Sequence, residues 1–133
     1  MKKNLKTDFS KILMLVAVII LMAAGYFVTR KRAYVREATS LPYYPVNLEE
    51  VADGVYYGKT YTSFLRLQLD VTIENHAIKN IDVIEAKGID GELARPIIQE
   101  MISANDVVVP AIKGAELGSL VYISCVSTAL NQN

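Results

Sequence analysis

The chain has 133 residues, of which 52% are hydrophobic, 14 are basic and 14 are acidic, and it holds one histidine and one cysteine. This length allows one small domain and an additional segment. Because Cys125 is the only cysteine and His76 the only histidine, an intrachain disulfide is excluded and no metal site built from cysteines and histidines is expected.

The charge is divided unevenly along the chain. Residues 1–36 hold eight Lys and Arg against one Asp, a net charge of +7, whereas residues 37–133 hold six Lys and Arg against thirteen acids, a net charge of −7. A nucleic-acid surface needs clustered Lys and Arg to replace the counterions of phosphates. The acidic second part therefore argues against nucleic acid as a partner.

An uncharged apolar run, Ile12–Val28, lies between Lys11 and the basic cluster Arg30 to Arg32. As a helix these residues would span about 25 Å, and flanking basic side chains can extend the span to the about 30 Å of a bilayer core. The pattern predicts a short basic tail at residues 1–11, a transmembrane helix at residues 12–29 and membrane lipid as a partner.

A cleaved signal peptide is the alternative, because Ala23, Ala24 and Gly25 follow a basic start and an apolar run. The apolar residues continue to Val28, and basic residues follow almost at once, which favours a retained anchor. Four basic residues precede the helix and four follow it. Charge therefore does not decide on which side of the membrane the rest of the chain lies.

Residues 30–46 are predicted to be a juxtamembrane linker, because Pro42 and Pro45 interrupt regular structure. A domain at residues 47–133 follows, and the tyrosine-rich segment Val55–Tyr61 suits its first strand. Apolar and polar residues then alternate from Leu65 to Glu74, which predicts a strand with one buried face.

A turn at Asn75 and His76 is expected to lead into a partner strand around Ile78–Ile84, where a slip in the alternation indicates a bulge. Apolar residues at spacings of three and four then predict a helix at Ala94–Ile102. Pro96 is acceptable only in the first turn of this helix.

Val107–Val109 is expected to be a short strand, and the segment Leu117–Thr128 fits both a helix and a strand. Its β-branched residues favour a strand, and its length favours a helix. The predicted fold class is therefore α+β, with a small antiparallel sheet of three to four strands packed by two helices and preceded by a single transmembrane helix.

The bend that contains Gly114 and Gly118 is the candidate binding site. Glycines at a strand-to-helix junction allow backbone N–H groups to approach a ligand closely, and a helix that begins near Gly118 would point its positive end at the same place. Such a corner suits a phosphate. The alternative is an ordinary corner of the chain with no ligand.

Four pieces of the chain, in this order, resemble the FMN-binding domain family, found in membrane-anchored flavin subunits of Rnf and Na+-translocating NADH:quinone reductase complexes. The resemblance covers about residues 53–130. The pieces are Asp53–Gly58, Lys79–Glu85, Ala94–Ile98, and Gly114-Ala115 with Ser119. The resemblance implies an electron-transfer domain that binds FMN, lies outside the cytoplasm and has membrane redox-complex subunits as partners.

The chain departs from the family at the covalent flavin site. In the family an Asp is followed, after two variable positions, by Ser-Gly-Ala-Thr, and the threonine carries FMN through a phosphoester. Here Pro110 takes the aspartate position, Lys113 the serine position and Glu116 the acceptor position. A carboxylate cannot form that bond, so no covalent flavin is expected.

Two functions from different classes follow from the resemblance. The first is an electron-transfer module with non-covalent FMN and neither catalytic residues nor a metal, in which the redox chemistry belongs to the cofactor. Its expected cofactor-binding residues are Lys113, Gly114, Ala115, Leu117, Gly118, Ser119, Tyr57 and Tyr61. The second is a flavin-free domain that has kept the fold and acts as an assembly or interaction subunit of a membrane complex.

Overall fold

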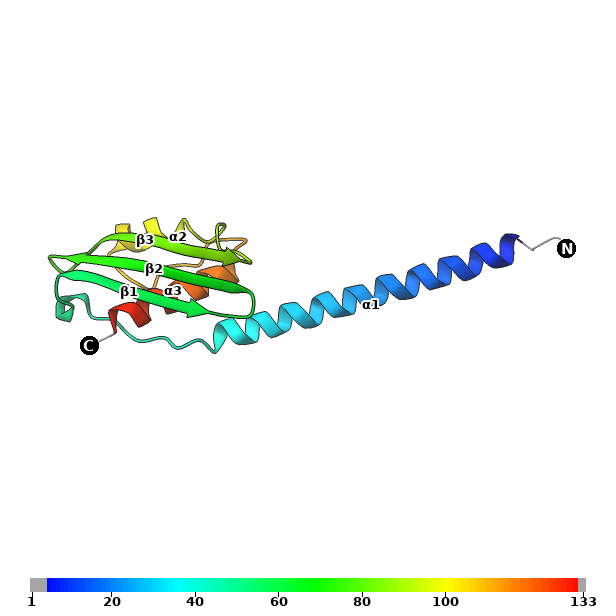
Figure 1. Ribbon diagram of the computed structural model, residues 1–133, viewed down its shortest axis with the longest axis horizontal. Helices are drawn as coiled ribbons and strands as arrows, with labels where there is room; N and C mark the ends of the chain where they lie inside the picture. Colours follow the sequence, from blue (N-terminus) through cyan, green and yellow to red (C-terminus); the bar gives the residue numbers. More distant parts are fainter. Residues whose placement is uncertain (1–4, 132–133) are drawn as a thin grey trace. The chain divides into compact units, whose positions relative to one another are not determined.

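The structure is a computed structural model that describes residues 5–131. Its contacts divide the chain into two units between Ala33 and Tyr34, and Figure 1 shows the elements. In chain order these are α1 (Leu5–Thr39), the 3-10 turn η1 (Leu48–Glu50), β1 (Gly54–Tyr61), β2 (Leu65–Glu74), β3 (Ala77–Gly88), α2 (Ile97–Ala104) and α3 (Glu116–Leu130). The predicted α+β class with a three-stranded antiparallel sheet is confirmed.

The helix α1 is long and apolar enough to cross a membrane. Its stretch Asp8–Thr39 has a mean hydropathy of 2.6 in the most apolar window, and none of that window is buried. The helix continues beyond the predicted end at residue 29, because its last residues belong to the second unit. There the ring of Tyr34 contacts the ring of Phe64 in a tilted arrangement, with centroids 5.1 Å apart, and Ala38 is buried.

The sheet has the order β1-β2-β3, with both neighbouring pairs antiparallel. Asn75 and His76 join β2 to β3 and both have positive φ, 53° and 60°, which suits a two-residue hairpin turn. The predicted bulge is present, since Glu85 pairs with Gln68 and Val83 with Leu69, so that Ile84 has no partner in the register.

The core of the second unit lies between one face of this sheet and the helices. Leu67, Leu69 and Val71 on β2 are fully buried, and α3 packs against β1 and β2 while α2 packs against β3. Gly58 allows this close packing, because a Cβ atom there would lie 2.8 Å from the carbonyl oxygen of Cys125. The face of the sheet that turns away from these helices is called the outer face below.

Two expectations need correction, and one open alternative is decided. Val107–Val109 is not a strand. Val107 and Val109 are buried and Val108 is exposed, but the segment does not pair with any strand of the sheet. The helix α2 begins after Pro96 rather than at Ala94. The ambiguous last segment is the helix α3, which shows no clear apolar stripe because it is buried on several sides.

Candidate functional site

The predicted turn is present at Lys113 and Gly114, where Gly114 has a φ of 88°. Gly118 does not belong to it, because α3 already begins at Glu116. A Cβ atom at position 118 would lie 2.7 Å from the carbonyl oxygen of Asp90 and 2.9 Å from Cβ of Ala94. Glycine at this position therefore allows α3 to pack closely against Asp90 and Ala94. A corner that binds no ligand would also need this glycine.

The backbone amides of this corner donate to groups of the chain itself. The hydroxyl of Ser119 accepts from the amide of Ile112 at 2.9 Å and donates to the carbonyl of Ala115 at 2.8 Å. The amide of Gly114 donates to Oε1 of Glu116 at 3.1 Å. The positive end of α3 is thus partly satisfied by an acidic side chain of its own first turn.

A second carboxylate reaches the corner from the loop after β3. The amide of Gly118 donates to Oδ2 of Asp90 at 3.4 Å, and Asp90 holds a φ of 62°. Two side-chain carboxylates therefore take amides that an incoming phosphate would need.

The other expected residues at the corner differ in exposure. Lys113 and Gly114 are exposed and Leu117 is half-buried, whereas Ala115, Gly118 and Ser119 are buried. The buried residues contact the protein core and present no side-chain surface to a flavin ring. Lys113 offers an exposed cation beside the turn.

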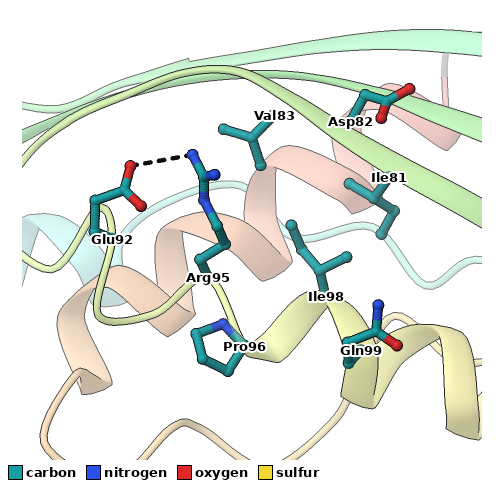
Figure 2. A pocket seen from close by; sticks show the side chains of 8 residues that line it. All are labelled: Ile81, Asp82, Val83, Glu92, Arg95, Pro96, Ile98 and Gln99. Carbon is teal, nitrogen blue, oxygen red and sulfur yellow. Dashed lines mark hydrogen bonds and ion pairs between the residues drawn. The ribbon is translucent and has the colours of Figure 1, made fainter.

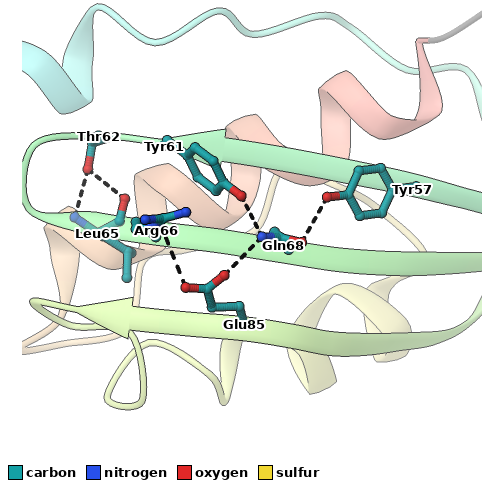
Figure 3. Close-up of polar contacts among 7 residues, drawn as sticks. All are labelled: Tyr57, Tyr61, Thr62, Leu65, Arg66, Gln68 and Glu85. Carbon is teal, nitrogen blue, oxygen red and sulfur yellow. Dashed lines mark hydrogen bonds and ion pairs between the residues drawn. The ribbon is translucent and has the colours of Figure 1, made fainter.

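The two predicted tyrosines lie elsewhere, on the outer face of the sheet (Figure 3). Tyr57 and Tyr61 alternate along β1 with Gly58, which faces α3. Because the corner leads into α3 on the opposite face, the sheet separates the tyrosines from the corner. The structure does not bring the eight expected binding residues together.

Gln68 joins the two tyrosines on the outer face. The hydroxyl of Tyr57 donates to Oε1 of Gln68 at 2.8 Å. The side-chain amide nitrogen of Gln68 contacts the hydroxyl of Tyr61 and donates to Glu85 at 2.9 Å. The Arg66 guanidinium lies 4.5 Å from the centre of the Tyr61 ring. The pKa of Tyr57 is raised, first by desolvation and then by the neighbouring Tyr61.

A groove between β3 and α2 was not expected from the sequence (Figure 2). Its volume is about 690 Å³. Its lining combines residues of β3 with residues just before and within α2, namely Ile81, Asp82, Val83, Glu92, Arg95, Pro96, Ile98 and Gln99. Arg95 lies in this groove and pairs with Glu92 at 3.1 Å. Nothing in the local sequence signals this groove, because it forms only when α2 returns alongside β3.

A second, apolar groove of about 430 Å³ follows the end of α1. Leu41 and Tyr43 line it together with Leu120 and Ile123 of α3. The hydroxyl of Ser124 donates to the carbonyl of Pro42 at 2.6 Å and ties the chain after α1 to α3.

Comparisons of the chain with protein families, with curated proteins and with solved structures found no match. Among the described residues, no group of three or more His, Cys, Asp or Glu side chains could hold a metal ion.

Proposed function

We propose that the chain is a membrane-anchored domain that acts without flavin, as an assembly or interaction subunit of a membrane complex. The observation that carries this proposal is the occupation of the corner amides by the chain's own Ser119, Glu116 and Asp90. A phosphate would have to displace two carboxylates and would meet their negative charge. The corner that resembles a flavin site is therefore better suited to stabilise the start of α3.

The placement of the tyrosines supports the same proposal. Ring contacts for a flavin were expected from Tyr57 and Tyr61, but these lie across the sheet from the corner. A single FMN cannot contact both groups of residues. The outer face instead presents exposed tyrosines and Arg66, residue types that are enriched in protein–protein interfaces.

Anchoring by α1 is part of the proposal. The helix has the required length and hydropathy, and Arg30, Lys31 and Arg32 can hold its end at the lipid headgroups. The resemblance implies that the second unit lies outside the cytoplasm, and we propose that location. In cells, the chain should stay with the membrane fraction after carbonate extraction, and protease added to spheroplasts should cleave the second unit.

The competing function is electron transfer by non-covalent FMN. Exposed Lys113 beside the turn at Gly114 favours it, because an ammonium group at a helix amino terminus can attract a phosphate. This function requires Glu116 to leave the amide of Gly114.

Titration with FMN separates the two functions. The purified full chain in detergent should be colourless and should leave the fluorescence of added FMN unchanged. The matched variant Glu116→Thr removes the carboxylate from the Gly114 amide and should bind FMN more tightly than the unaltered chain does. Retention of FMN by the unaltered chain would support the electron-transfer function instead.

A further inference from the structure

Within residues 34–131, no helix or strand covers the outer face of the sheet, because α2 and α3 pack on the opposite face. The even-numbered residues of β2 point to this outer face, since Leu67, Leu69 and Val71 between them are fully buried. Residues directly opposite each other on neighbouring strands share a face. The strand register therefore sorts the outer side chains into rows across the sheet.

Three of these rows differ in charge. The basic row is Tyr61, Arg66 and Lys87, the middle row is Lys59, Gln68 and Glu85, and the acidic row is Tyr57, Asp70 and Asp82. The basic and acidic rows lie at equal distances on either side of the middle row, because Arg66 and Asp70 are each two residues from Gln68.

The acidic row is unbalanced within one chain. Asp70 and Asp82 are directly opposite each other, and like charges in this arrangement destabilise a sheet. Among the described residues, neither takes part in an ion pair; Asp82 accepts a hydrogen bond from the side-chain amide of Asn80 at 3.0 Å. The row thus presents two carboxylates to whatever covers it.

We infer that the outer face binds the outer face of a second copy of this chain. A two-fold rotation about the middle row places the basic row of each copy over the acidic row of the other. Tyr61 then meets Tyr57 of the second copy, Arg66 meets its Asp70, and Lys87 meets its Asp82. A closed dimer requires such a self-complementary surface.

The middle row, which meets its own equivalent at the axis, does not oppose this arrangement. The Lys59 ammonium lies over the Tyr61 ring at 5.3 Å from its centre, and Glu85 lies 3.7 Å from the Arg66 guanidinium. Lys59 and Glu85 are thus each drawn toward a residue of the basic row in their own copy. The uncharged side chain of Gln68 therefore lies nearest to the axis.

The contact is small. Three strands about 4.8 Å apart and eight residues long cover about 14 by 26 Å, less than the about 800 Å² per partner of a typical stable interface. The association therefore depends on the high local concentration that a shared membrane provides, and in this respect it rests on the anchoring proposed above.

Thiol-specific cross-linking in vesicles tests this inference. Sheets that pack face to face lie about 10 Å apart, which is too far for a direct disulfide. The full chain is therefore reconstituted at low density in phosphatidylcholine vesicles, sedimented, and treated with a short bis-maleimide. Gln68→Cys lies at the axis and should cross-link to its equivalent, whereas Thr72→Cys on the same face would lie about 26 Å from its own and should not. The unaltered chain, whose Cys125 is buried, is the blank.

Charge reversal identifies the contact between the rows. In the Gln68→Cys background, Asp82→Lys alone and Lys87→Glu alone should each lower the cross-linked fraction at least about fivefold, because each change acts twice in a symmetric dimer. A mixture of these two variants should restore the cross-linked fraction. In a pair made of one copy of each variant, both contacts between positions 82 and 87 join opposite charges.

Each outcome has a distinct meaning. Sedimented Gln68→Cys chains that do not cross-link would overturn the self-association and leave the anchoring intact. Cross-linking that both charge variants retain would overturn the proposed register. Chains that fail to sediment with vesicles would overturn the anchoring and, with it, the association that depends on it.

Discussion

Ser119 and Cys125 illustrate how single side chains of α3 serve the interior of the second unit. The Ser119 hydroxyl satisfies both the amide of Ile112 and the carbonyl of Ala115, so that a polar group is fully buried at little cost. Cys125 is the only cysteine and is fully buried beside β1. Both residues stabilise the fold, and neither contacts an open site.

Because the thiol of Cys125 is buried, we expect the second unit to lose stability at high pH. Burial raises its pKa to about 11 from an ordinary value of 9.0. Above about pH 9 the unfolded chain releases a proton that the folded chain retains, so this contribution is present below pH 9 and declines as the pH rises toward 11. The decline should approach about 1.4 kcal/mol per pH unit.

Urea unfolding followed by circular dichroism at several pH values in this window measures the decline. The variant Cys125→Ala should lack this part of the pH dependence, although it retains that of the tyrosines. An identical pH dependence in the two chains would show that the thiol is not desolvated.

At the scale of single elements, the sequence predicted what depends on local pattern and failed where distant contacts decide. Strict alternation located β2 and the bulge in β3, because one face of each strand is buried. Three consecutive β-branched residues also suggested a strand at Val107–Val109, where burial does alternate but the segment pairs with no strand of the sheet. For α3, burial on several sides removed the period that would have distinguished a helix from a strand.

The contact between β1 and α3 gives a prediction at this scale. A methyl group in Gly58→Ala would lie 2.8 Å from the Cys125 carbonyl and 2.9 Å from Cβ of Ala129, so α3 must move away from the sheet. The free energy of unfolding should fall by about 1–3 kcal/mol. The control Val55→Ala, on the exposed side of the same strand, should change it by less than about 1 kcal/mol.

Thermal or urea unfolding of the two variants compares these effects directly. Equal losses in both would mean that α3 does not press against β1 at Gly58.

For the whole molecule, the sequence correctly predicted an α+β domain behind an apolar helix, but the domain begins earlier than expected. The carboxylate of Glu37 near the end of α1 accepts hydrogen bonds from the amide of Ser63, at 2.8 Å, and from its hydroxyl. Tyr34 packs on Phe64 in the same turn. Part of the segment expected to be a linker thus belongs to the second unit. Its contact with Ser63, which is distant in the sequence, determines this, and local composition does not reveal it.

The candidate site was only partly predictable for the same reason. The turn at Gly114 followed from the sequence, whereas the occupation of the corner amides depends in part on Asp90, a residue of the loop after β3. The register that places Tyr57 and Tyr61 on the outer face likewise depends on pairing with β2. The spacing of residues along the chain predicts neither the occupied amides nor the register of β1.

Amide hydrogen exchange at the corner tests the central claim most directly. In the full chain without any ligand, the amides of Ile112, Gly114 and Gly118 should exchange slowly, because Ser119, Glu116 and Asp90 hold them, and added FMN should leave their rates unchanged. Rapid exchange that becomes slow only after FMN is added would contradict this account, because it would show amides that await a phosphate.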